Sequence, residues 1–141
     1  MSNTMLRKRI QVVALILVVS LFLAVTATLA TTKLIKAKNG GKLNIASGEA
    51  KLVIPPGALE EDTVISADMI EEGEYIYFQF EPDGLTFAEP ATLMISQSVI
   101  DKLEDTILYG PGSLEILPGY SNRKWMEYQI DHFSLYYFRR R

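Results

Sequence analysis

The residues best suited to chemistry lie near the end of the chain, where His132 and Ser134 flank Phe133. His132 is the only histidine in the protein. A serine hydroxyl is a weak nucleophile until a neighbouring base takes its proton, and histidine is the commonest base. Attack by the Ser134 hydroxyl on the Phe133 carbonyl would cut the chain between these two residues through an ester. That reaction requires a strained peptide or a stabilised oxyanion.

The surrounding sequence favours a structural role for this triplet. Residues 132–138 have the composition of a single β-strand, in which alternate side chains face opposite sides. We expect Phe133, Leu135 and Tyr137 in the core and His132 hydrogen-bonded near Asp131. In such a strand His132 and Ser134 lie about 7 Å apart, too far for a hydrogen bond. We therefore predict no catalytic residue, and self-cleavage by Ser134 with His132 as base stays an alternative.

Short apolar–polar alternating segments recur every 8–12 residues after residue 41, which is typical of an antiparallel β-sandwich. Strands are expected over 42–46, 49–54, 63–70, 74–80, 85–87, 91–96, 114–117, 124–130 and 132–138. A two-turn helix capped by Ser98 is expected over 98–107. The predicted fold class is all-β, an antiparallel sandwich preceded by one N-terminal transmembrane or signal helix.

The N-terminal segment predicts that helix. Residues 10–32 carry no charge, and the basic cluster Arg7-Lys8-Arg9 precedes them. About 20 apolar residues cross a bilayer as a helix, and a basic flank stays in the cytoplasm. We expect residues 1–32 to form a basic segment and a membrane anchor, 33–41 a linker, 42–138 an extracytoplasmic sandwich and 139–141 a basic tail. Cleavage of the segment as a signal peptide is the alternative, and the protein would then be secreted.

Charge and composition exclude several function classes. Residues 42–138 carry 5 basic and 17 acidic side chains, a net charge of −12, which disfavours nucleic acid as a partner. The absence of cysteine excludes disulfides, thiol catalysis and thiolate metal sites, and a single histidine leaves little room for zinc. We predict no metal and no cofactor. Glu81, Asp83 and Glu89 could form a calcium loop, but their spacing is more typical of a solvated hairpin.

Five landmarks occur in a fixed order along the chain. They are Gly40-Gly41, Ile54 to Leu59 (Ile-Pro-Pro-Gly-Ala-Leu), Thr63 to Ile65, Pro82 to Pro90, and His132 to Ser134. In this order they resemble the ZU-five domain, which zonula occludens proteins, uncoordinated-five netrin receptors and ankyrins share. The resemblance covers residues 39–138 and implies a β-sandwich used for protein–protein contacts. Some relatives cut their own chain between the Phe and Ser of the triplet.

The setting differs from that of the animal members, which place the domain in the cytoplasm of large proteins. A domain alone behind a membrane segment resembles the exported prokaryotic versions, so the animal partners are not carried over. We expect a membrane-tethered module for protein–protein interaction or cell-surface structure, and not an enzyme. An envelope glycan-binding module is a further alternative, with Tyr75, Tyr77, Trp125 or Tyr136 as the stacking surface. Exposed rings grouped on one face would favour it, and burial would exclude it.

Overall fold

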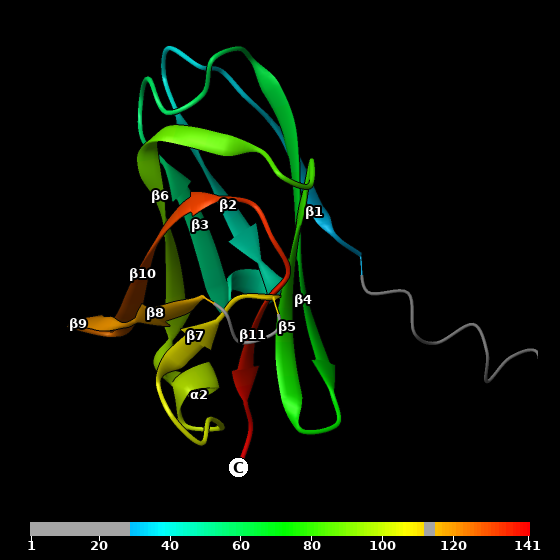
Figure 1. Cartoon of the computed structure of the whole chain (residues 1–141), viewed down its shortest axis with the longest axis vertical. Coiled ribbons are helices and arrows are strands. Elements are labelled where there is room, and N and C mark those ends of the chain that lie inside the picture. The colour runs from blue at the N-terminus through cyan, green and yellow to red at the C-terminus, as the bar shows by residue number, and fades with distance from the viewer. Residues whose placement is uncertain (1–28, 112–114) are drawn as a thin grey trace, which may run out of the picture.

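Two antiparallel β-sheets pack face to face in the computed structural model, which describes residues 29–111 and 115–141 (Figure 1). The six-stranded sheet has the order β1 (Thr31–Ile35), β4 (Thr63–Glu72), β5 (Tyr75–Glu81), β11 (Tyr136–Arg139), β7 (Ile107–Tyr109) and β8 (Ile116–Pro118). The five-stranded sheet has the order β2 (Gly41–Ile45), β3 (Ala50–Ile54), β6 (Thr86–Ser96), β10 (Trp125–His132) and β9 (Tyr120–Asn122). The predicted all-β class is confirmed.

The predicted N-terminal helix lies almost wholly outside the described residues, because 1–28 are not described. Within the described ranges, no helix has the length and apolar composition needed to cross a membrane. The helices described there are a 3-10 turn, η1 (Ala46–Gly48), and a single α-helical turn, α2 (Gln97–Ile100). The membrane anchor therefore stays a prediction, but its predicted end is wrong: Thr31 and Thr32 belong to β1 and pair with β4.

The core lies between the two sheets and follows the alternation expected from the sequence. In β5, which the sequence predicts over 74–80, Ile76, Phe78 and Phe80 are buried while Tyr75 and Tyr77 face outward. Among the described residues every buried side chain is hydrophobic or aromatic, and no buried side-chain polar atom lacks a hydrogen-bond partner. The sandwich is thus held together by apolar burial, which is the dominant favourable term in folding.

The Ile-Pro-Pro-Gly-Ala-Leu landmark forms a corner that ends strand β3. β3 ends at Ile54, Gly57 has a φ of +79°, and Ala58 and Leu59 are buried behind the turn. The Gly57 N–H donates to the Ala37 carbonyl oxygen at 2.9 Å. Two consecutive prolines cannot donate ladder hydrogen bonds, so the strand must end before them.

Residues 33–41 are not a linker, contrary to prediction. Residues 31–35 form β1, which pairs in register with β4 from Thr31↔Ala67 to Ile35↔Thr63. A further bridge joins Lys36 to Gly40. β1 is short, lies at the sheet edge and exposes Lys33, and lysines on short strands are typical of protected edges. Because such an edge strand is short and mostly exposed, its composition resembles that of a linker.

Two other sequence predictions in the middle of the chain are wrong. The segments 85–87 and 91–96 belong to one strand, β6, and the helix expected over 98–107 ends at Ile100. Ser98 lies inside this helix, and its hydroxyl contacts Ser96 instead of capping. The short strands β7 and β9 were not predicted, because three residues are too few to show a period.

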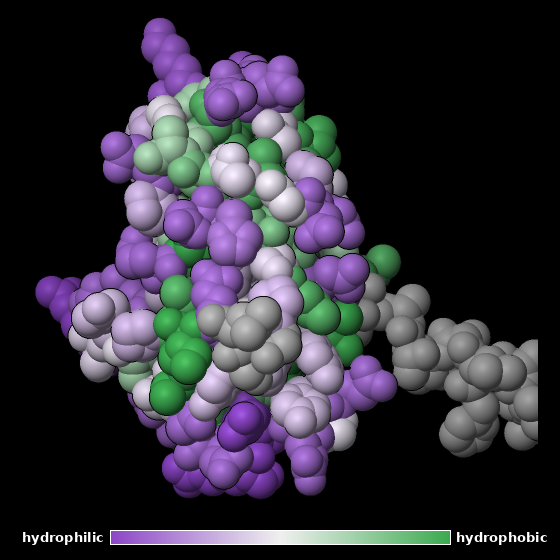
Figure 2. All heavy atoms as spheres, viewed as in Figure 1, coloured by the Kyte–Doolittle hydropathy of each residue, from purple (hydrophilic) through white to green (hydrophobic). Residues whose placement is uncertain are grey.

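The end of the chain also differs from the prediction. Residues 132–138 are not one strand: His132 ends β10, residues 133–135 cross between the sheets, and Tyr136 begins β11. Arg139 belongs to β11, and Arg140 pairs with Leu103, so residues 139–141 extend the sheet instead of forming a separate tail. Strongly hydrophilic residues gather at this end of the molecule (Figure 2).

Candidate functional site

The His132-Phe133-Ser134 triplet forms the crossing from the five-stranded sheet to the six-stranded sheet. The Phe133 N–H donates to the Leu85 carbonyl oxygen at 2.7 Å, and the Phe133 carbonyl oxygen accepts from the Gly84 N–H at 3.1 Å. Its ring is 1% exposed and stacks on Phe80, with ring centroids 4.9 Å apart. Phe133 therefore fixes the crossing by main-chain pairing and by aromatic packing.

Tyr136, the first residue after the crossing, also stabilises it. Its hydroxyl donates to the His132 carbonyl oxygen at 2.9 Å, four residues upstream. This resembles the tyrosine corner of immunoglobulin-type sandwiches, in which a tyrosine at a strand start bonds back to upstream backbone. Burial, reinforced by the charges of Glu115 and Asp131, raises the pKa of Tyr136 well above its usual value. The phenol therefore stays protonated and keeps donating at neutral pH.

The core assignments predicted for this segment are partly wrong. Phe133 is buried as expected, but Leu135 is 46% exposed and Tyr137 is only partly buried, whereas Tyr136 and Phe138 are fully buried. The alternation of buried and exposed side chains does not continue through residues 133–135, because these three residues do not have strand geometry. It starts again at Tyr136 with the opposite phase. The predicted hydrogen bond of His132 is confirmed: its Nδ1 lies 2.7 Å from Asp131 Oδ1.

The geometry needed for self-cleavage is only partly present. The Gly84 N–H on the Phe133 carbonyl is the type of donor that stabilises an oxyanion. However, no hydrogen bond within the described part of the chain joins the His132 ring to the Ser134 hydroxyl. The non-glycine residues with positive φ in that part are Ala46, Ser47 and Arg123, and none of them belongs to the triplet. Self-cleavage at Phe133–Ser134 therefore stays an alternative prediction.

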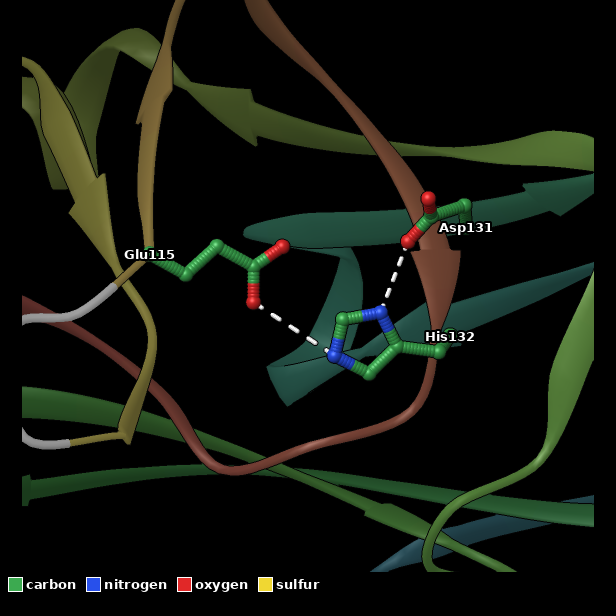
Figure 3. A group of neighbouring side chains, drawn as sticks. All are labelled: Glu115, Asp131 and His132. Carbon is green, nitrogen blue, oxygen red and sulfur yellow. Dashed lines mark hydrogen bonds and ion pairs between the residues drawn. The ribbon is translucent and has the colours of Figure 1, made fainter.

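Figure 3 shows the His132 ring between two carboxylates, those of Glu115 and Asp131. Asp131 Oδ1 lies 2.7 Å from Nδ1, and Glu115 Oε2 lies 3.4 Å from Nε2. The His132 side chain is 36% exposed, so solvent reaches the cluster. One ligand atom from each of the three residues lies within 4.8 Å of the others.

Two local features of the fold build this cluster. The β10–β6 register shifts between Ile130 and His132, and such an irregularity lets the neighbouring side chains Asp131 and His132 face one another. Glu115 follows the three residues that the structure does not describe and precedes β8. The Gly110 N–H donates to the Glu115 carbonyl oxygen at 2.8 Å, which holds Glu115 next to the end of β7.

Glu115 was not predicted as a site residue, because it lies 17 positions before His132 and in no recognisable spacing with it. The three acids of the alternative calcium loop, Glu81, Asp83 and Glu89, do not form such a group in the described part of the chain. The one group of potential metal ligands within the described ranges is Glu115, Asp131 and His132. Glu81 instead accepts the Asp83 N–H at 3.1 Å, as part of the turn.

A second feature is an aromatic cluster on the outer face of the six-stranded sheet, which we call the tyrosine surface. It consists of the partly exposed Tyr75, Tyr77 and Tyr137, the exposed Arg139, and Tyr109, which is 9% exposed and buried among its neighbours. Tyr137 lies directly opposite Tyr77 on β5 and opposite Tyr109 on β7, so the three rings form a row across three strands. Tyr109 and Tyr137 stack with centroids 5.5 Å apart, and the Arg139 guanidinium lies 4.9 Å from the centroid of Tyr109.

Of the four aromatics predicted as a stacking surface, two belong to this cluster. The ring centroids of Tyr75 and Tyr77 lie 5.7 Å apart, and both side chains are partly exposed. Trp125 lies on β10 in the other sheet, where Lys51 covers its ring at 4.4 Å, and Tyr136 is buried. Of the four predicted aromatics, Tyr75 and Tyr77 therefore lie together, Trp125 is partly exposed on the other sheet, and Tyr136 is excluded by burial.

Comparison with known proteins gives no family: no family model matches the chain, and no curated protein matches it.

Proposed function

We propose that the protein is a membrane-tethered, extracytoplasmic β-sandwich of the ZU-five type that binds a protein partner through the tyrosine surface. The row of Tyr77, Tyr137 and Tyr109 across β5, β11 and β7 is the observation that carries this proposal. Tyrosine and arginine are the residues enriched at the energetic centres of protein interfaces, whereas lysine and glutamate are depleted there.

The arrangement of the rings supports a contact role. Each ring of the surface packs against at least one other, with centroids 5.5–6.2 Å apart. Rings held by their neighbours lose little conformational entropy on binding, and this lowers the cost of association. The surface therefore offers preordered aromatic area from the partly exposed Tyr75, Tyr77 and Tyr137, which suits a binding face.

The position of β1 is consistent with a membrane span directly before the sandwich. In this proposal the membrane span ends before β1, which begins at Thr31, so the sandwich follows the span with almost no slack. The exposed side chains of Leu34 and Val64 lie opposite each other on β1 and β4, next to that junction. The domain would thus be held close to the membrane surface.

Topology can be tested cleanly because the chain contains no cysteine. Ser121 is exposed on β9, and Ser2 lies before the predicted span, so Ser121→Cys and Ser2→Cys each give one label site. We expect a membrane-impermeant maleimide to label position 121 in intact cells, and position 2 only after permeabilisation. Labelling of position 2 but not position 121 in intact cells would overturn the topology.

A glycan ligand is the second candidate, because polar groups adjoin the rings. Glu74, Tyr75, Glu104, Arg139 and Arg140 line a hollow of about 140 Å³ at the edge of the tyrosine surface. Sugar recognition combines an aromatic face with a few placed hydrogen-bonding groups, as in small-ligand sites generally. Binding of the purified full chain to isolated envelope polysaccharide, abolished by Tyr75→Ala and retained by Tyr120→Ala, would support this candidate over a protein partner.

A further inference from the structure

The two ring nitrogens of His132 are in different situations. Nδ1 is hydrogen-bonded to Asp131 at 2.7 Å, which favours the tautomer that carries its proton on Nδ1. Nε2 makes no hydrogen bond within the described residues and faces Glu115 Oε2 at 3.4 Å. In that tautomer a nitrogen lone pair and a carboxylate oxygen point at each other. Two acceptors so placed repel unless a cation lies between them.

The separation of these two atoms suits a metal ion. Zinc–nitrogen and zinc–oxygen bonds are about 2.0–2.2 Å long, so two ligands at a tetrahedral angle lie about 3.3–3.4 Å apart. The observed Nε2–Oε2 distance is 3.4 Å. We propose that His132 and Glu115 bind a divalent transition-metal ion of the zinc class, with Asp131 as the residue that positions the imidazole. This proposal goes beyond the binding function above and does not depend on it.

Asp131 has the place that a supporting carboxylate occupies in zinc proteins. A metal-binding histidine nearly always donates its other ring N–H to a carboxylate or carbonyl, which fixes the ring and raises its basicity. Asp131 lies on the Nδ1 side of the ring and Glu115 on the Nε2 side (Figure 3). Asp131 therefore orients the ring and does not bind the ion itself.

The backbone holds both ligands in place before the ion binds. His132 pairs with Thr86 at the end of β10, and its carbonyl accepts the Tyr136 hydroxyl. A Cβ added to Gly110 would lie 2.6 Å from Glu115 Cβ and 2.8 Å from Oε2, so the absence of a side chain at Gly110 lets Glu115 fold toward His132. The site is thus preorganised, which reduces the cost of binding.

The donor set selects the class of ion. An imidazole nitrogen with a carboxylate suits zinc and related transition metals, whereas calcium requires six to eight oxygen ligands. Two protein ligands leave coordination positions for water or for a donor from a bound partner. The site is therefore open, unlike a closed structural zinc site with four protein ligands.

The experiment uses the full chain in detergent micelles, with its histidine labelled with nitrogen-15. Because the protein has one histidine, the ring nitrogens give a single pair of NMR signals. We expect zinc chloride to shift the Nε2 signal in a saturable 1:1 titration, and calcium chloride at the same concentration to leave it unchanged. No saturation by zinc below about 1 mM would overturn the proposal.

Variants distinguish a built site from a lone surface histidine. Glu115→Gln should weaken zinc binding at least tenfold, and Asp131→Asn should weaken it about 10–100-fold while the 1:1 stoichiometry remains. Glu89→Gln, at an exposed position on β6, is the matched control and should bind as the parent does. Unchanged zinc affinity in Glu115→Gln would overturn the proposal, because zinc would then be bound by the histidine alone. The side chains of Glu115, Asp131 and Glu89 are partly or fully exposed. The three variants should therefore keep the circular dichroism spectrum of the parent protein.

Discussion

The hydroxyl of Tyr136 donates a hydrogen bond to the carbonyl oxygen of His132 at 2.9 Å, across the crossing that joins the two sheets. This bond connects the first residue of β11 to the last residue of β10. The bond also holds the main chain of His132, the only histidine in the protein, in position. The stability of the sandwich and the geometry of the Glu115–Asp131–His132 cluster therefore depend on the same local structure.

Removal of that hydroxyl should destabilise the domain. Tyr136→Phe keeps the buried ring but leaves the His132 carbonyl without its partner, which we expect to cost about 1–3 kcal/mol of unfolding free energy. Urea unfolding followed by fluorescence of the single tryptophan, Trp125, measures the change. Tyr77→Phe, at a partly exposed position on β5, is the control and should change the unfolding free energy by less than about 0.5 kcal/mol. Equal effects of the two substitutions would contradict the role of the bond.

Phe133 should be the most sensitive residue of the triplet. Its ring is 1% exposed between Phe80 and Phe87, so Phe133→Ala should cost about 3–5 kcal/mol through the cavity it leaves. Leu135→Ala, two residues on and 46% exposed, is the control and should cost less than about 1 kcal/mol. The same urea experiment compares them. A similar loss in both variants would mean that the crossing is not anchored by Phe133.

Alkaline titration should separate the buried tyrosines from the others. Burial raises the pKa of Tyr128 and of Tyr136 well above the usual value near 10. Because the folded-state pKa is raised above the unfolded one, this stabilisation is fully present below about pH 10 and is lost as the pH rises toward the folded-state values. We expect the tyrosinate absorbance of the folded protein to rise in two steps. Tyr128→Phe should remove part of the second step and reduce the alkaline loss of stability.

A single absorbance step for all seven tyrosines, while the protein remains folded, would contradict this assignment. The Tyr128 hydroxyl donates to the Thr106 carbonyl oxygen at 2.7 Å, so its ionisation would place an anion against an acceptor. Unfolding must be monitored in parallel by circular dichroism, because an unfolded chain exposes every tyrosine to solvent.

The chain should remain intact between Phe133 and Ser134. Cleavage there would release residues 134–141, but β11 could stay paired in the sheet, so the mass must be measured under denaturing conditions. We expect the parent protein and Ser134→Ala to show the same uncut mass after prolonged incubation, because no described contact makes His132 a base for Ser134. A truncated species in the parent that is absent from Ser134→Ala would show that the triplet is reactive.

The sequence predicted the long elements of the fold because their patterns extend over many residues. The alternation of Ile76, Phe78 and Phe80 marked β5, and Pro55-Pro56 marked the end of β3. It failed at β1, because one buried residue, Ile35, among exposed lysines does not establish a period. It also failed at residues 133–135, where the chain changes sheets.

The candidate sites were harder to predict because both are assembled across strands. Asp131 was expected beside His132, but Glu115 reaches the ring only because β8 begins near the end of β10 in space. Likewise, Tyr75 and Tyr77 were recognised as outward-facing, but their neighbours Tyr109 and Tyr137 come from β7 and β11. Strand order determines such neighbours, and local periodicity does not contain strand order.

Photo-crosslinking from the tyrosine surface tests the central proposal most directly. A photoreactive phenylalanine analogue replaces Tyr77 in the full-length protein in its native membrane, and the control carries it at Tyr120, which is 64% exposed on β9 in the opposite sheet. We predict a discrete protein adduct from position 77 that is lost when Tyr75→Ala is added, and no such adduct from position 120. The same adducts from both positions, or none from position 77, would contradict a protein-binding role for the tyrosine surface.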